Sequence, residues 1–162
     1  MAGTSFTIET SMKKILSIYE VLFGVVGVGM TLFILGPILL AGIAGSEFSI
    51  VALCIFLLAI VFYVVSVIAG VLLYLNKALG KTLSIVMHIL QVPVFTVGGI
   101  TYFISLGLNI PVIAGATANG FSFGLRFFFG PQFSLSFGEN GFLAGLNIAA
   151  VILVVLFSST RD

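Results

Sequence analysis

Residues 21–46 read VLFGVVGVGMTLFILGPILLAGIAGS, 26 residues without a charge between Glu20 and Glu47. A helix needs about 20 apolar residues to cross the roughly 30 Å hydrocarbon core of a bilayer, because each residue advances it by about 1.5 Å. The run is also longer than the apolar core of a signal peptide, about 7–15 residues. The stretch therefore predicts a retained membrane span, at about residues 15–44.

The composition extends this prediction to the whole chain. Hydrophobic residues make up 60% of the 162 residues and charged residues only 7%, whereas soluble domains carry about 25% charged residues. We therefore expect the lipid bilayer to be the main partner of the surface. The formal net charge of +1 offers no electrostatic basis for binding nucleic acid.

Three further spans are predicted, at about residues 50–76, 82–108 and 141–159. The third comes from a 44-residue uncharged stretch that Pro111 divides, since proline lacks an N–H donor and disfavours helix in the residue before it. We therefore expect an all-α membrane protein, a single transmembrane domain over residues 1–162 that forms a bundle of four transmembrane helices.

The basic residues orient this layout. Five of the six fall on one side of it: Lys13, Lys14, Lys77, Lys81 and Arg161. Only Arg126 falls on the other side. Because lysine and arginine are enriched on the cytoplasmic side of membrane spans, we expect a multi-pass protein with its N-terminus and C-terminus both cytoplasmic.

The connection before the fourth span has a different pattern, with large apolar residues alternating with small or polar ones around Gly130-Pro131. Such alternation on both sides of a turn is typical of a β-hairpin with one apolar face, which we place at about residues 120–138, on the extracytoplasmic side. Its apolar residues form a candidate assembly surface: Phe121, Phe123, Leu125, Phe127, Phe129, Phe133, Leu135 and Phe137. The hairpin would cap the bundle, lie in the lipid headgroup layer, or pair with a neighbouring subunit through its free edge.

Small and polar residues mark the faces where membrane helices meet. The first span carries such a stripe at helical spacing: Ser17, Glu20, Gly24, Gly27 and Thr31. A candidate intramembrane polar cluster draws on three spans: Glu20, Tyr74, Ser84, His88 and Gln91. Glu20 lies six residues after Lys14, and His88 lies seven after Lys81, so we expect similar depths. One interpretation is that the pair relays a proton or binds a cation. The other is that Glu20 reaches the cytoplasmic interface or pairs with a lysine there, while His88 forms a hydrogen bond to a neighbouring helix.

The sequence predicts no catalytic residues, no cofactor and no metal site. The chain has one histidine and one cysteine, Cys54, which cannot form a metal site by themselves. The glycine-rich residues 24–29 lie inside a predicted span and follow no strand, so they do not predict a nucleotide-binding loop.

One stretch resembles small four-span bacterial membrane proteins of unassigned function, in which an Ala-Gly-x-Leu-Leu helix end is followed by a Lys-Gly turn and a helix with polar residues on one face. The residues concerned are Ala69-Gly70-Val71-Leu72-Leu73, Lys77, Gly80, Ser84, Gln91, Tyr102 and Gly107. The resemblance implies a bacterial inner membrane and carries no activity.

Two functions remain open at this point. We expect a non-enzymatic structural or accessory membrane subunit, which assembles with itself or with another membrane protein through its small-residue helix faces and its phenylalanine-rich hairpin. The alternative is a small oligomeric transporter or channel component, with a polar route near Glu20 and His88. A cavity reaching these two residues would favour the alternative, and dry packing would favour the first function.

Overall fold

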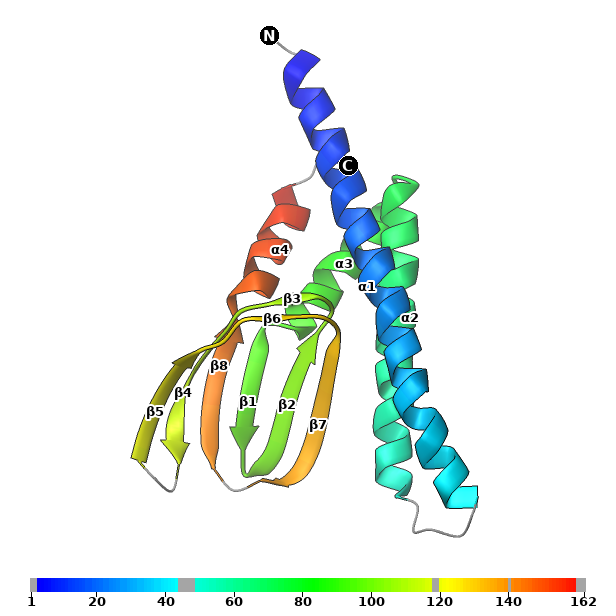
Figure 1. The fold of residues 1–162 in the computed structure, drawn as a ribbon. Coiled ribbons are helices and arrows are strands. Elements are labelled where there is room, and N and C mark those ends of the chain that lie inside the picture. The colour runs from blue at the N-terminus through cyan, green and yellow to red at the C-terminus, as the bar shows by residue number, and fades with distance from the viewer. Residues whose placement is uncertain (1–2, 44–48, 118–119, 140, 160–162) are drawn as a thin grey trace.

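The computed structural model describes residues 3–43, 49–117, 120–139 and 141–159. The helices of these segments are α1 (Gly3–Ile43), α2 (Ile50–Tyr74), α3 (Ala78–Leu90) and α4 (Ile148–Ser159). The strands are β1 (Pro93–Val97), β2 (Gly99–Ser105), β3 (Leu108–Asn109), β4 (Pro111–Thr117), β5 (Gly120–Leu125), β6 (Phe128–Phe129), β7 (Gln132–Glu139) and β8 (Phe142–Asn147). Figure 1 shows α1 and α2 as a long antiparallel pair, with a sheet beside one half of the pair.

The α1–α2 pair packs through small residues. Gly27 lies against the ring of Tyr63, and Gly70 lies against the backbone of Ser17. The Ser17 hydroxyl donates a hydrogen bond of 2.7 Å to the Gly70 carbonyl. Because these positions lack a Cβ, the two backbones approach closely along the face that the small-residue stripe of α1 predicted.

Two helices are long and apolar enough to cross a membrane, Ser11–Leu40 within α1 and the whole of α2. They correspond to the predicted spans at 15–44 and 50–76, of which residue 44 lies outside the described residues. The other two helices have 13 and 12 residues, fewer than the roughly 20 that a crossing needs. The predicted all-α bundle of four transmembrane helices is therefore wrong.

The third predicted span, at 82–108, is half helix and half hairpin. Helix α3 ends at Leu90, and β1 begins at Pro93. Gly98 and Gly99, with φ of +59° and +84°, then join β1 to β2 in a two-residue turn, which needs positive φ at both positions. The physical reason for the error is that a long uncharged run reports apolar surroundings, and these suit a strand as well as a helix.

The strands form a six-stranded sheet in the order β5-β4-β8-β1-β2-β7, and β3 pairs separately with β6. Strands β5 and β7 carry the alternation that predicted a hairpin at 120–138, yet they lie at opposite edges of the sheet. β5 pairs with β4, and β7 pairs with β2. The predicted pairing across Gly130-Pro131 is therefore wrong, because alternation specifies which face a residue occupies and not which strand it meets.

The register gives the sheet one apolar face and one mixed face, which we call the polar face. On the apolar face, Phe121 and Phe142 flank Ala116, while Leu125 and Leu146 flank Val112. The polar face carries Ser122, Gly115, Thr96, Thr101, Ser134 and Ser136, and with them the apolar Leu143, Ile113, Val94 and Phe103. At β5 the apolar face is uncovered, since Phe121 is 79% exposed, whereas at β2 the same face is buried, since Ile104 is 6% exposed. A water-soluble sheet buries its apolar face, so the uncovered part at β5 is the unusual feature.

Helix α4 continues directly from β8, so the fourth predicted span at 141–159 is also wrong as a single helix. The change from strand to helix occurs at Asn147, whose Oδ1 accepts hydrogen bonds from the N–H of Ile110 (3.1 Å) and of Ala150 (3.4 Å). Asparagine at this position caps the first turn of the helix, and here it also ties α4 to the loop before β4.

We expect Gly27→Ala to lower the free energy of unfolding by about 1–3 kcal/mol, the usual cost of overpacking, because a Cβ at this position would collide with the Tyr63 ring. Gly29→Ala is the matched control on the same helix, since a Cβ there meets nothing within 4 Å and alanine favours helix. Denaturant unfolding in mild detergent measures both. Equal effects of the two substitutions would contradict the α1–α2 packing.

Candidate functional site

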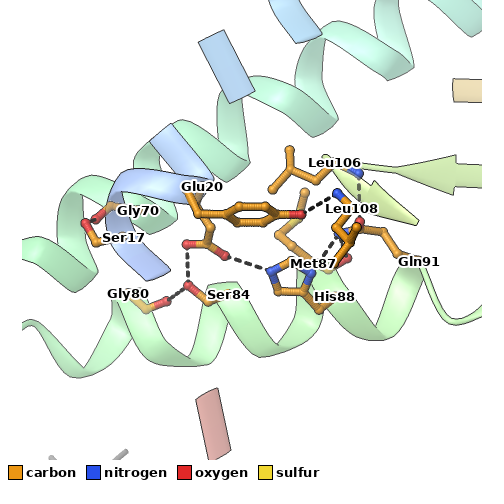
Figure 2. A network of polar contacts seen from close by, with 11 residues as sticks. Ser17, Glu20, Gly70, Gly80, Ser84, Met87, His88, Gln91, Leu106 and Leu108 are labelled. Carbon is orange, nitrogen blue, oxygen red and sulfur yellow. Dashed lines mark hydrogen bonds and ion pairs between the residues drawn. The ribbon is translucent and has the colours of Figure 1, made fainter. Parts of the chain in front are cut away.

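The polar side chains of α1 and α3 meet in the interior. Figure 2 shows Glu20 of α1 beside Ser84 and His88, which lie one turn apart on the same face of α3. The Ser84 hydroxyl donates to Glu20 Oε2 at 2.7 Å, and it also lies 2.9 Å from the carbonyl oxygen of Gly80. His88 Nε2 is 3.4 Å from Glu20 Oε1, close but without hydrogen-bond geometry. All three side chains are fully buried.

Gln91 determines which nitrogen of His88 carries the proton. The Leu106 N–H donates to Gln91 Oε1 at 2.7 Å, so the amide nitrogen of Gln91 must face the other way. That nitrogen lies 3.0 Å from the Met87 carbonyl and 3.1 Å from His88 Nδ1. Since an amide nitrogen only donates, Nδ1 must be the acceptor. The neutral ring therefore carries its proton on Nε2, the nitrogen that faces Glu20.

Aromatic rings lie around His88, the partner of Glu20. Phe157 of α4 stacks on the His88 ring with centroids 5.1 Å apart, and the Tyr19 ring lies 6.4 Å away on α1. The Tyr19 hydroxyl accepts a hydrogen bond of 2.8 Å from the Leu108 N–H. Helices α1, α3 and α4 and the residues after β2 therefore converge on one buried point, which we call the polar junction (Glu20, Ser84, His88 and Gln91).

Glycine is needed where the chain after β2 meets α1. A Cβ at Gly107 would lie 2.7 Å from the Tyr19 hydroxyl and 2.8 Å from the Phe23 ring, closer than side-chain atoms approach one another. The backbone at Gly107 therefore sits directly against α1, between the two N–H groups that bond to Gln91 and Tyr19.

Several further buried polar atoms have no hydrogen-bond partner among the residues that the structure describes. They are Ser66 Oγ, Ser105 Oγ, both side-chain polar atoms of Asn109, and Asn147 Nδ2. Each such group costs about 1–3 kcal/mol relative to a paired one. The interior is thus more polar than helix and strand packing requires.

The structure brings together four of the five residues of the predicted polar cluster. It brings Glu20, Ser84, His88 and Gln91 together, whereas Tyr74 is exposed and lines a groove on the α1–α2 surface with Ser17 and Val71. A second cavity, of about 220 Å³, lies between α1, α2 and β7 and is lined by Gly27, Tyr63 and Phe133. Neither of these two cavities is lined by Glu20 or His88.

The residues of the predicted assembly surface do not form one surface. Phe121, Phe123 and Leu125 lie exposed on the apolar face of β5, and Phe127 is exposed after it. The Phe129 ring meets Phe23 with centroids 5.1 Å apart, and that of Phe133 meets Phe62 at 6.2 Å. Leu135 is half-buried on β7, and the side chain of Phe137 lies outside the described residues.

Sequence reasoning missed Tyr19, Phe157 and the backbone donors of Leu106 and Leu108. Tyr19 immediately precedes Glu20, but its partner is 89 positions away along the chain, and no local pattern indicates such a contact. Asn147 did carry a signal, since asparagine before an apolar helix-forming run is typical of a helix N-terminus.

The junction does not have the order of a hydrolytic triad. In such a triad the serine bonds to the histidine, which acts as its base, and the histidine bonds to the acid. Here Ser84 donates to Glu20, and His88 Nδ1 faces Gln91, so Ser84 is bonded to the acid and not to the histidine. No group of three or more His, Cys, Asp or Glu side chains able to hold a metal ion occurs in the described part of the chain.

No model of a known protein family matches the chain, no curated protein sequence matches it, and no solved structure matches it. The resemblance to small four-span bacterial membrane proteins stays a prediction.

We expect Ser84→Ala to lower the free energy of unfolding by about 1–3 kcal/mol, because it leaves Glu20 Oε2 buried without a donor. Thr82→Ala is the matched control on the same helix. The Thr82 hydroxyl also bonds back to a helix carbonyl, but the side chain is exposed, so a change within about 0.5 kcal/mol is expected. Unfolding curves in the same detergent measure both variants, and a Ser84→Ala protein as stable as the control would contradict the contact.

We expect the ¹⁵N spectrum of the single histidine to show a protonated Nε2 and an unprotonated Nδ1. Gln91→Glu replaces the donor facing Nδ1 by an acceptor, so Nδ1 should become protonated. Solid-state NMR of histidine-labelled protein in bilayers measures both forms. A wild-type spectrum with a proton on Nδ1 would contradict the hydrogen-bond assignment.

Proposed function

We propose that the protein is a non-enzymatic membrane subunit, held in the bilayer by the α1–α2 pair and joined to a larger assembly through its sheet. The observation that carries this proposal is the uncovered apolar face at the β5 end of the sheet. Phe121, Phe123 and Leu125 are 79%, 71% and 66% exposed there. An apolar face directed outward is what a hydrocarbon solvent favours.

The position of the sheet supports the same proposal. Phe62 of α2 meets Phe133 of β7, and Gly27 and Tyr63 line a cavity with Phe133. The three helix residues belong to the two apolar spans. If these helices cross the bilayer, the neighbouring sheet lies at membrane depth. Arg126 is exposed after β5, and the register directs its side chain away from the apolar face.

The distribution of lysines supports one orientation. Lys13 and Lys14 lie near the start of the α1 span, and Lys77 and Lys81 lie around the turn between α2 and α3. Figure 1 places these two regions toward the same end of the molecule. By the preference of lysine for the cytoplasmic side, we propose that this end is cytoplasmic, in a bacterial inner membrane.

The polar junction favours a structural role over transport. Glu20 and His88 are both 0% exposed, and an aromatic ring stacks on the imidazole. A route for ions would need polar space beside these side chains, whereas a packing role needs their hydrogen bonds to be enclosed. We therefore propose that the junction holds the sheet against the helices.

The placement of the sheet is tested with two adjacent residues on its opposite faces. In a Cys54→Ser background, a fluorophore attached at Phe123→Cys should be quenched strongly by lipids brominated in their acyl chains. The same fluorophore at Ser122→Cys, on the polar face, should be quenched less by several-fold. Quenching of both positions by aqueous iodide, with none by the brominated lipids, would place the sheet outside the bilayer and contradict the proposal.

The assembly role is tested by the mass of the particle extracted from membranes in mild detergent. We expect a mass above that of one chain, either from further copies or from another protein. A particle containing a single copy and nothing else, in detergent and in bilayers, would contradict it.

A further inference from the structure

The fold treats the two edges of the sheet differently. The β7 edge lies against α1 and α2, where Phe133 contacts Phe62 and lines a cavity with Gly27 and Tyr63. The β5 edge pairs with β4 on one side, and no strand in the segments that the structure describes pairs with its other side. Side chains of α1 and α2 therefore lie beside the β7 edge, while the outward side of β5, which we call the bare edge, has no strand beside it.

The bare edge presents backbone hydrogen-bonding groups in a defined pattern. The Arg126 N–H donates to the Pro111 carbonyl on β4 at 3.1 Å. In an antiparallel strand the N–H and C=O of one residue point to the same side, and successive residues alternate. The backbone groups of Phe121, Phe123 and Leu125 must therefore point away from β4, toward the bare side.

Nothing in β5 protects this edge. Natural edge strands are blocked by lysine, proline, an inward-pointing charge or a bulge. Residues 120–125 read GFSFGL, without a charge or a proline, and their pairing with β4 continues without a shift in register. The strand is thus uncharged, without a bulge, and open to another strand.

Lipid is able to cover the apolar face of the sheet but not its edge, because acyl chains neither donate nor accept hydrogen bonds. Resting on the proposed membrane placement, we infer that β5 pairs with β5 of a second copy of this chain. The two strands run antiparallel about a twofold axis at Phe123, which gives a continuous sheet with six strands from each copy.

This register is self-complementary. Phe123 lies opposite the same residue of the second copy, and Phe121 lies opposite Leu125, so every outward-pointing N–H meets a carbonyl. The three side chains stay on the apolar face, where they form cross-strand aromatic and aliphatic pairs.

The exposed apolar area at the edge is small, which agrees with an interface held mainly by backbone hydrogen bonds. At about 200 Å² for each large side chain, these three residues expose about 400 Å² in each copy, near half of the roughly 800 Å² that each partner buries in a standard interface. In hydrocarbon, burial of apolar area adds little to association, so the edge hydrogen bonds are the decisive contribution.

Disulfide formation tests the register in full-length protein reconstituted in phosphatidylcholine vesicles. Cys54, which is exposed on α2, is replaced by Ser in every variant. Phe123→Cys should form a disulfide-linked dimer on oxidation, since the two Cα atoms of a directly opposed pair lie about 5.5 Å apart. Phe142→Cys is the matched control on the same apolar face, two strands from the edge, and should form none.

A second pair of variants separates the backbone from the side chain. Phe123→Pro removes an N–H that points away from β4, so it should leave the fold intact but halve the mass of the particle. Phe123→Ala keeps the N–H and should remain dimeric. Circular dichroism of both variants checks that the fold is retained.

Three results would overturn the inference. The first is a disulfide-linked dimer of Phe142→Cys without one of Phe123→Cys, which would indicate face-to-face contact. The second is an equal loss of the dimer in Phe123→Ala and Phe123→Pro. The third is a wild-type particle that contains another protein but no second copy. The last result would leave the proposed assembly role standing. Lack of quenching by brominated lipids at Phe123→Cys would instead refute the membrane placement itself.

Discussion

Gln91 stands between the end of α3 and the start of the sheet, and both ends of its amide are engaged. Its oxygen accepts from the Leu106 N–H at the end of β2, and its nitrogen faces Met87 and His88. Because a buried amide cannot turn without losing these bonds, the position of β2 and the proton on His88 depend on each other. The imidazole in turn faces Glu20, so one side chain links the sheet to α1.

The sheet meets two different requirements of an apolar solvent. Large side chains on the outward face need only hydrocarbon contact, whereas backbone N–H and C=O groups need partners. Inside the sheet the strands provide those partners, and beside the β7 edge side chains of α1 and α2 line a cavity. The outward side of β5 has no strand partner within the described segments of the chain. The proposed second copy follows from this difference between covering a face and pairing an edge.

The polar junction lies at the opposite end of the sheet's connections from the edge of β5, yet it affects where that edge lies. The junction holds β2, and with it the whole sheet, at a fixed place beside α1 and α2 through contacts of Glu20, His88 and Gln91. A sheet held in this way presents β5 in a constant orientation on the side away from the helices. The buried polar groups therefore have a structural consequence even though they reach no cavity.

Length and composition determined the two apolar helices, since the charge-free runs 21–40 and 50–74 lie in helices long and apolar enough to cross a membrane. The helical spacing also placed Glu20, Ser84 and His88 on helix faces. Alternation identified β5 and β7 as strands with an apolar face. Only the tertiary structure decided that α3 stops at Leu90, that β5 and β7 never meet, and that Gln91 bonds to Leu106. Apolar residues satisfy helix and strand alike in an apolar environment, so the partner of each segment depends on contacts far apart in the sequence.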